Sequence, residues 1–307
     1  MSFFRRRQPD AEPATPSATA NTNGEAAGDA SLPGITLHYA TWGTANPARA
    51  TLLVHGLTAS HKEWARLAPT LAADGCYVIA PDLRGRGRSS KPAQGYGVAF
   101  HAADLVALCD SLGLDTVDVV GHSLGAVIGM YMAALYPQRV RRLVMVDAGG
   151  NIPEDTAQAI AASVSRLGTV YPSLDAYLGL MQQLPMFEWD DMWEAYFRYD
   201  AEVRADGTVT SGVPKAAIEE ESLALGLTRS EALPDLVRAP TLLVRATVGL
   251  LGPDRGLILP RAEAERLQGI IPNCQLIEIE GANHYTVVTV QPFMESVRAF
   301  LAGDEGL

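Results

Sequence analysis

Short apolar runs alternate with amphipathic segments along most of the chain from residue 35 onward. The runs are rich in Val, Ile, Leu and Thr and predict strands over residues 35–41, 51–55, 77–80, 117–120, 143–146, 241–245 and 275–279. Helical periodicity predicts helices over residues 62–74, 100–112, 124–136, 261–270 and 292–301. Near-continuous apolar strands separated by helices predict an α/β fold, in which a mainly parallel sheet carries helices on both faces.

The alternation of strand and helix breaks between residues 150 and 233. This segment has helix-like stretches, no strong strand pattern and many large apolar or aromatic side chains. Trp193 and Phe197 lie one helical turn apart, a spacing typical of a buried helix face. Any one of these side chains is explained by a buried helix face. As a group, they indicate a helical cap that lies over the strand ends and lines a pocket. Trp193 and Phe197 are therefore the candidate pocket residues.

The first residues of the chain differ in composition from the rest. Residues 1–31 are rich in Pro, Ala, Thr, Asn and Gly and carry almost no large apolar side chains beyond the first few positions. Such a segment buries too little surface to offset its ordering entropy, so we expect a disordered tail. The remaining organisation is a core in two parts, residues 32–149 and 234–307, interrupted by the cap at 150–233.

Targeting signals and membrane spans are weak in this sequence. Arg5, Arg6 and Arg7 resemble the start of a signal peptide, but no apolar stretch of the required length follows, and no later stretch is long enough to span a bilayer. We expect a cytoplasmic protein without stable membrane insertion. A weak electrostatic contact of Phe3, Phe4 and the three arginines with a membrane surface is the alternative.

Charge and cysteine content narrow the range of partners. The net charge of −11 argues against nucleic-acid binding, which needs a basic surface. Cys76, Cys109 and Cys274 are odd in number and widely spaced, so they indicate neither a disulfide framework nor a zinc site and suit a reducing compartment. The expected partner is a small apolar substrate. The sequence carries no signal of oligomeric state.

The most informative motif is the run Gly-His-Ser-Leu-Gly at positions 121–125, between a predicted strand and a predicted helix. In that context Gly121 and Gly125 permit a sharp turn, which exposes the Ser123 hydroxyl above the sheet edge at a helix N-terminus. This is the pattern of a nucleophile elbow. Ser123 is the candidate nucleophile.

Four ordered motifs carry a resemblance to a known family. They are LVHG at 53–56, PDLRGRGRS at 81–89, GHSLG at 121–125 and GANH at 281–284. From about residue 35 to its end, the chain resembles the α/β-hydrolase superfamily, and within it a serine esterase or lactonase with a helical cap. The superfamily hosts several chemistries, so the reaction must be argued from the site.

A serine nucleophile needs a base to accept its proton. His284 lies on a loop after the last predicted strand, where the superfamily's order of serine, acid and histidine places the base. His55 belongs to the His-Gly turn and is expected to be structural, and His122 is expected to point away from the nucleophile. The others, His38, His61 and His101, have no serine motif or carboxylate beside them and are expected to be surface or packing residues.

Two aspartates compete for the role of the triad acid. Asp254 follows the predicted strand 241–245 and precedes His284, which satisfies the superfamily order, although the loop before it is long and apolar. Asp147 ends the strand 143–146, the other position from which related folds supply the carboxylate. We favour Asp254. Its role would be to hold the imidazole tautomer and stabilise the imidazolium.

The resemblance also implies an oxyanion hole and excludes some chemistry. The backbone N–H groups of Leu57 and Leu124 would stabilise the negative charge that develops on the substrate oxygen. A dehalogenase or epoxide hydrolase of this fold would carry an aspartate in place of Ser123. No metal-ligand motif or dinucleotide fingerprint is present, so we expect no cofactor.

Together these features predict a cofactor-free serine hydrolase that cleaves carboxylic esters or lactones through an acyl-enzyme on Ser123. Hydrolysis of a carbon–carbon bond with the same triad is an alternative that the sequence leaves open. A small-molecule receptor that retains the triad without turnover is a further alternative, from a different class of protein.

Overall fold

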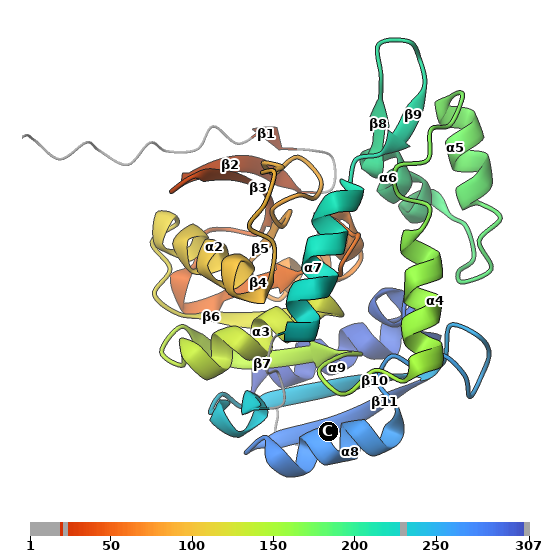
Figure 1. The fold of residues 1–307 in the computed structure, drawn as a ribbon. Coiled ribbons are helices and arrows are strands. Elements are labelled where there is room, and N and C mark those ends of the chain that lie inside the picture. The colour runs from red at the N-terminus through yellow and green to blue at the C-terminus, as the bar shows by residue number, and fades with distance from the viewer. Residues whose placement is uncertain (1–18, 21–23, 228–231, 304–307) are drawn as a thin grey trace, which may run out of the picture.

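A nine-stranded sheet forms the centre of the molecule, with the strand order β1-β2-β3-β5-β4-β6-β7-β10-β11 (Figure 1). The computed structural model describes residues 19–20, 24–227 and 232–303. Strands β4, β5, β6, β7, β10 and β11 run parallel to one another, whereas β3 pairs antiparallel with β5, β2 with β3, and β1 with β2. The α/β fold with a mainly parallel sheet is therefore confirmed.

Seven strands of this sheet overlap the predicted apolar runs, whereas β1 and β2 were not predicted. The strands are β1 (Thr19–Ala20), β2 (Ala26–Leu32), β3 (Ile35–Trp42), β4 (Ala50–Val54), β5 (Tyr77–Pro81), β6 (Val117–His122), β7 (Val140–Val146), β10 (Thr241–Val248) and β11 (Cys274–Asn283). Successive residues of a strand point to opposite faces, so Val119 of β6 packs on one face and Val120 on the other. Both faces are apolar because both are covered.

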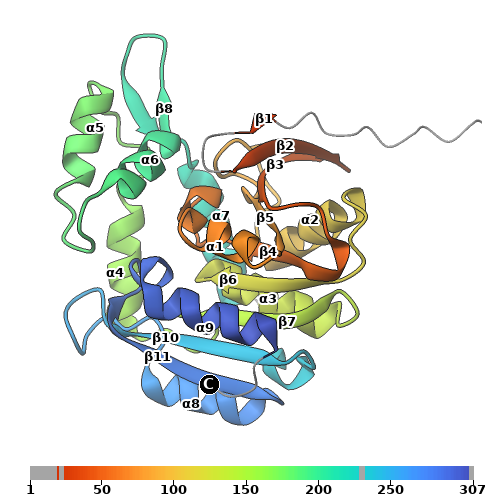
Figure 2. The same cartoon turned by 180° about the vertical axis from the view of Figure 1, so that it is seen from behind.

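Helices cover the two faces of the sheet unequally. The core helices are α1 (Leu67–Ala73), α2 (Val98–Ser111), α3 (Leu124–Leu135), α8 (Arg261–Ile270) and α9 (Gln291–Ala302). Helices α2, α3 and α8 pack on one face, and α1 and α9 pack on the other (Figures 1 and 2). The predicted helix over 62–74 is divided in two: a 3-10 turn η2 (His61–Trp64) precedes α1.

The predicted tail over residues 1–31 is wrong for its last part. Residues Ala26–Leu32 form β2, which pairs with β3 along its whole length. Beyond Ala26 and Ala27, which pair with β1, strand β2 has a neighbouring strand only on the β3 side, and backbone pairing with β3 lets its small residues suffice. The rest of the predicted tail, including Arg5 to Arg7, lies largely outside the described residues.

The insert between β7 and β10 contains α4 (Glu154–Val164), α5 (Leu174–Met181), α6 (Asp191–Asp200) and α7 (Lys215–Leu227). It also contains a hairpin, β8 (Ala201–Val203) with β9 (Val209–Ser211), which the sequence pattern did not predict. These strands are only three residues long, too short to show an alternating pattern.

The insert packs over the loops that follow the carboxyl ends of the strands. Tyr199 of α6 donates to Asp82 after β5, and the Asn283 side chain at the end of β11 donates to the Met186 carbonyl. Figures 1 and 2 show the insert in green on this side of the sheet. In the described part of the chain, no helix combines the length and apolar character needed to cross a bilayer.

The crossing of β6, β4 and α3 is too close for side chains at two positions. A Cβ atom on Gly125 would lie 2.0 Å from the Val54 carbonyl oxygen, and one on Gly121 would lie 2.1 Å from the Gly125 carbonyl oxygen. Both obstacles are backbone atoms, which cannot rotate away. Glycine is therefore required for α3 to begin directly against the central strands.

Gly125→Ala should lower the free energy of unfolding by roughly 2–3 kcal/mol, because the added methyl meets backbone. Gly179→Ala is the matched control: Gly179 lies in α5, and its added Cβ meets nothing within 4 Å. There we expect stabilisation of roughly 0.5–1 kcal/mol. Urea denaturation of both variants measures the difference. Equal effects at the two positions would contradict the crowding argument.

Candidate active site

Ser123 stands at the tip of a strained turn between β6 and α3. Its backbone has φ 55° and ψ −120°, a conformation that residues with side chains rarely adopt. The turn is held by a hydrogen bond from the Ser123 N–H to the Val146 carbonyl at 3.0 Å. Because α3 starts at Leu124, the serine lies at a helix N-terminus, where developing negative charge is stabilised.

Three side chains from separate loops form a hydrogen-bonded chain. The Nε2 atom of His284 lies 3.0 Å from Oγ of Ser123, and its Nδ1 atom lies 2.8 Å from Oδ2 of Asp147. Asp147 is 2% exposed and His284 is 8% exposed, so both interactions are shielded from solvent. The structure thus joins Ser123 and His284 as the sequence indicated.

The carboxylate of this chain is Asp147, and the preference for Asp254 is wrong. Asp254 is exposed in a turn, because the segment after β10 folds back on itself through backbone hydrogen bonds such as Leu251 N–H to the Arg255 carbonyl at 3.0 Å. Asp147 has a positive φ of 49° and accepts a hydrogen bond at Oδ1 from the Ala246 N–H at 3.0 Å. The strained backbone and this second contact aim Oδ2 at His284.

Burial lowers the pKa of His284, and the neighbouring His122 lowers it further. The hydrogen bond and charge of Asp147 act in the opposite direction. The net shift is downward from 6.5, so the imidazole is neutral at physiological pH. A neutral imidazole whose Nδ1–H is held by a carboxylate leaves Nε2 free to accept the serine proton.

The loop after β4 lies against the nucleophile. A Cβ on Gly56 would lie 3.4 Å from the Ser123 Cβ, so the backbone of this loop at Gly56 is close to Ser123. Buried Arg86 donates from Nε to the Leu57 carbonyl at 2.9 Å, which fixes the loop. Within the described residues, neither the Leu57 nor the Leu124 N–H donates to a protein acceptor, which leaves both available to a substrate oxygen.

Sequence reasoning missed the environment of His122. Its ring does not contact the Ser123 hydroxyl, but it does not point to solvent either: Nδ1 lies 2.9 Å from Oε1 of Glu63 and Nε2 lies 2.9 Å from the His284 carbonyl oxygen. The His122 and His284 rings are 4.5 Å apart. Glu63 belongs to a turn far from His122 in sequence, so no local pattern signals the pair.

The remaining histidines are buried, and three of them contact carboxylates. His55 is structural, as expected: Nδ1 donates to the Gly56 carbonyl, Nε2 accepts from the Leu83 N–H, and burial lowers its pKa to about 4. The other three are buried, which agrees with the expectation of surface or packing residues, and the structure adds carboxylate partners that the sequence did not indicate. Their partners, distant in sequence, are Asp29 for His38, Asp82 for His61 and Glu221 for His101.

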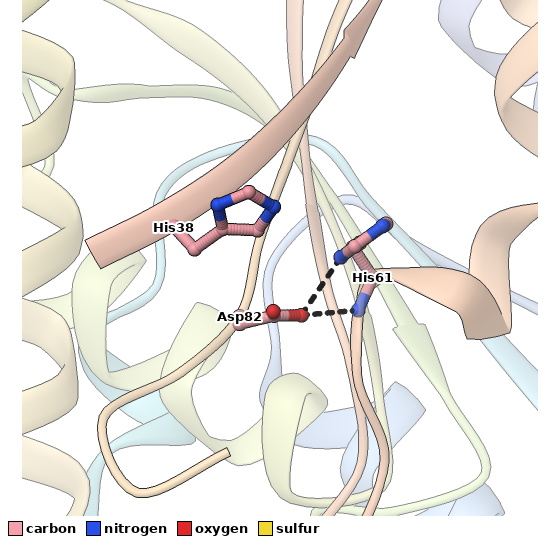
Figure 3. Close-up of side chains that lie close together, drawn as sticks. All are labelled: His38, His61 and Asp82. Atoms are coloured by element: carbon pink, nitrogen blue, oxygen red, sulfur yellow. Dashed lines mark hydrogen bonds and ion pairs between the residues drawn. The ribbon is translucent and has the colours of Figure 1, made fainter. Parts of the chain in front are cut away.

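His38, His61 and Asp82 form a buried cluster whose imidazole nitrogens and carboxylate oxygens are atoms that could bind a metal ion (Figure 3). Oδ1 of Asp82 accepts from both the backbone N–H of His61 at 2.8 Å and its Nδ1 at 2.9 Å, and Oδ2 accepts from the Arg88 N–H and the Tyr199 hydroxyl. Both carboxylate oxygens therefore already have two protein donors. The hydrogen bonds of Asp82 connect the loop after β5, residues 82–90, to η2 through His61 and to α6 through Tyr199.

The candidate pocket residues Trp193 and Phe197 lie in the apolar core of the insert. They are 7% and 4% exposed, and Phe187 stacks on Trp193 with ring centroids 4.1 Å apart. A cavity of about 260 Å³ lies instead between the insert and the core loops, lined by Thr58, Arg88, Tyr196 and Tyr199 among others. Ser123, His284 and Asp147 are not among the residues that line it.

Tyr196 of α6 lines this cavity, as Tyr199 does. Its ring packs on Trp193 and Phe197, with centroids 5.5 and 5.0 Å away. Burial raises the pKa of its hydroxyl, and the charge of Glu63 raises it further. Helical spacing in the sequence could not separate Tyr196 from its buried neighbours.

Known proteins resemble this chain in sequence and in fold. A 3-hydroxybutyrate-oligomer hydrolase of Cupriavidus necator is 34% identical over 152 residues, 49% of this chain and 47% of that relative. A soluble epoxide hydrolase of a Corynebacterium is 39% identical over 118 residues, 38% of this chain and 40% of that relative. The chain thus spans about half or less of the length of these relatives.

The structure of E-2-(acetamidomethylene)succinate hydrolase superposes with a TM-score of 0.80 at 24% identity, covering 90% of this chain and 98% of that one. The family model described as the alpha/beta hydrolase fold matches residues 51–289, which include the elbow, Asp147 and His284. The chain therefore belongs to the α/β-hydrolase family and is a hydrolase of that fold.

Proposed function

We propose that this hydrolase cleaves carboxylic esters or lactones through an acyl-enzyme on Ser123. The observation that carries the proposal is the hydrogen-bonded chain from Ser123 Oγ through His284 to Asp147, at 3.0 and 2.8 Å, on a strained elbow. A serine hydroxyl is a weak nucleophile, and an adjacent oriented imidazole is the arrangement that activates it.

In the first half-reaction, Ser123 Oγ attacks the carbonyl carbon while His284 Nε2 accepts its proton. Asp147 holds the Nδ1–H tautomer and stabilises the imidazolium without becoming protonated. The Leu57 and Leu124 N–H groups donate to the oxyanion of the tetrahedral intermediate. The imidazolium then protonates the leaving alcohol. In the second half-reaction, His284 takes a proton from water as the water oxygen attacks the acyl carbon. The bond between the acyl carbon and Ser123 Oγ then breaks, the carboxylic acid leaves, and Oγ recovers the proton from the imidazolium.

The choice of substrate class rests on the nucleophile and on one relative. Displacement at carbon by an aspartate, as expected of an epoxide hydrolase of this fold, is not available to Ser123. An oligomer of 3-hydroxybutyrate is joined through ester bonds, so the similarity to an oligomer hydrolase supports ester cleavage. The insert, which we propose acts as a cap, would select the acyl and alcohol groups.

Ser123→Ala should abolish hydrolysis of p-nitrophenyl esters while leaving the melting temperature close to that of the wild type. The loss should be several orders of magnitude, because removal of a triad member leaves only about 10³–10⁴ of acceleration over water. Repeated turnover by the wild type separates an enzyme from a receptor, which would stop after one event. More than a tenth of wild-type activity in the variant would reject Ser123 as nucleophile.

Asp147→Asn should lower kcat by about 10⁴, because an amide cannot hold the required His284 tautomer. Asp254→Asn is the matched control and should retain nearly full activity, since Asp254 is exposed and distant from the chain of hydrogen bonds. Steady-state kinetics on one ester distinguishes the two. A larger loss in Asp254→Asn would return the acid role to that residue.

Substrate selection should depend on Tyr196 more than on Trp193. Tyr196→Ala should change the ratio of kcat/KM between short and long acyl esters by roughly 1–3 kcal/mol, the worth of lost apolar contacts in a pocket. Trp193→Ala should leave that ratio unchanged and lower the free energy of unfolding by about 3–5 kcal/mol. A two-substrate assay and denaturation of both variants measure these effects. A changed kcat/KM ratio in Trp193→Ala together with an unchanged ratio in Tyr196→Ala would instead indicate that Trp193 lines the pocket.

A further inference from the structure

A second buried pair of charged groups lies directly beside the triad. Glu63 and His122 meet at 2.9 Å, and their side chains are 10% and 3% exposed. Neither side chain takes part in the proposed transfer of the serine proton. Burying two ionisable groups is costly unless they are paired and hydrogen-bonded, so their place beside Ser123 calls for a role.

The hydrogen bonds of His122 define its protonation state. Nε2 faces the backbone carbonyl of His284, which can only accept, so Nε2 carries a proton. Nδ1 faces a carboxylate oxygen of Glu63. With Glu63 ionised, Nδ1 also donates, and the ring is an imidazolium. Both nitrogens are then satisfied.

Glu63 connects three parts of the site. Its Oε1 atom accepts from His122, and its Oε2 atom accepts from the Gly56 N–H at 3.1 Å. Gly56 lies near the start of residues 55–60, the loop after β4 that carries the Leu57 N–H and is called the oxyanion loop below. His122 in turn donates to the main chain of His284. One carboxylate therefore fixes the backbone of the oxyanion loop, the residue before the nucleophile and the loop of the catalytic base.

The charges around this pair agree with an ion pair. Burial opposes the ionised form of Glu63, but His122 and the Gly56 N–H hold the pKa of its carboxyl below the usual value. Burial also opposes the His122 cation. The charge and the hydrogen bond of Glu63, with smaller help from Asp147, together outweigh burial, so the pKa of the His122 imidazole is raised. The electrostatic interaction with His55 also lowers the pKa of the Glu63 carboxyl.

We propose that Glu63 and His122 form a buried ion pair that positions the oxyanion loop and the His284 loop and keeps the His284 imidazole unprotonated at neutral pH. This inference rests on the proposed function of Ser123 and His284. A cation 4.5 Å from the His284 ring disfavours a second proton there, while Asp147 and the more distant Glu63 favour it. Glu63 and His122 are positioning residues, because neither touches the reacting bond.

Glu63→Gln removes the charge and keeps the hydrogen bonds. The amide oxygen can accept from the Gly56 N–H, the amide nitrogen can donate to His122 Nδ1, and neutral His122 can still donate from Nε2 to the His284 carbonyl. The variant should therefore fold normally. With His122 neutral, the pKa of His284 rises, because the cation that lowered it is gone.

The pH dependence of kcat/KM on an ester tests this effect. The acid limb of the profile reports protonation of the free base, so in Glu63→Gln it should move to higher pH. We expect kcat/KM to fall several-fold near pH 6 and to change by less than about threefold near pH 8.5. In Glu63→Gln with His122→Gln the limb should stay where Glu63→Gln places it, since His122 is already neutral.

Glu220→Gln is the matched control. Glu220 accepts from the backbone N–H groups of Gly95 and Tyr96 at 2.9 and 3.0 Å, as Glu63 does from Gly56, but has no histidine hydrogen-bonded to it in the described part of the chain. Its pH profile should overlay that of the wild type. A Glu63→Gln profile that also overlays the wild type, or one reduced equally at every pH with a lowered melting temperature, would overturn the proposal.

A readout without catalysis separates this inference from the proposed function. Nitrogen NMR of protein labelled at its six histidines should show, near pH 7.5, an imidazolium that is lost in His122→Gln and becomes neutral in Glu63→Gln. A neutral His122 in the wild type would reject the ion pair. Absence of ester turnover together with a cationic His122 would reject the substrate class and keep the pair.

Discussion

The close contact between the start of α3 and the end of β4 is the constraint on which the site depends. Gly125 lets the helix begin against the Val54 carbonyl, and Gly121 lets β6 turn directly into that helix. This geometry forces Ser123 into a positive φ and places its hydroxyl beside the loop at Gly56. The backbone strain at Ser123 is thus maintained by the packing of α3 against the central strands.

Three buried histidines near the Ser123 turn, His55, His284 and His122, have different surroundings and therefore different roles. His55 is neutral and structural, because its two nitrogens face one carbonyl and one N–H. His284 faces a carboxylate and a hydroxyl, the environment of a base. His122 faces a carboxylate and a carbonyl, the environment of a cation. Burial and hydrogen-bond partners together thus give residues of one type different roles: His55 and His284 are neutral, and His122 is the proposed cation.

The sequence predicted the fold and the contact between Ser123 and His284 well, because these depend on local signals. Strand runs, helix periodicity and the glycines of the elbow each act over a few residues. Chain order was less informative for the acid, since Asp147 and Asp254 both lie between Ser123 and His284. Only the backbone hydrogen bonds of the loop after β10 leave Asp254 in solvent and Asp147 against the imidazole.

The features that sequence reasoning missed are contacts between distant segments. Glu63 meets His122 across 59 positions, and Tyr199 meets Asp82 across 117. Strand β2 was missed for a different reason: its small residues give no apolar pattern, and it is held by backbone pairing with β3. Such features follow from the closed fold and have no local signature.

The central claim is that Ser123 becomes acylated during turnover. Rapid quenching of the wild type in acid during hydrolysis of a slowly deacylating ester, followed by mass spectrometry of the peptides, tests it most directly. The account predicts the mass of one acyl group on the peptide that contains Ser123, formed within the first turnover and absent in Asp147→Asn on that timescale. Acylation of another residue, or steady turnover with no acylated Ser123, would contradict it.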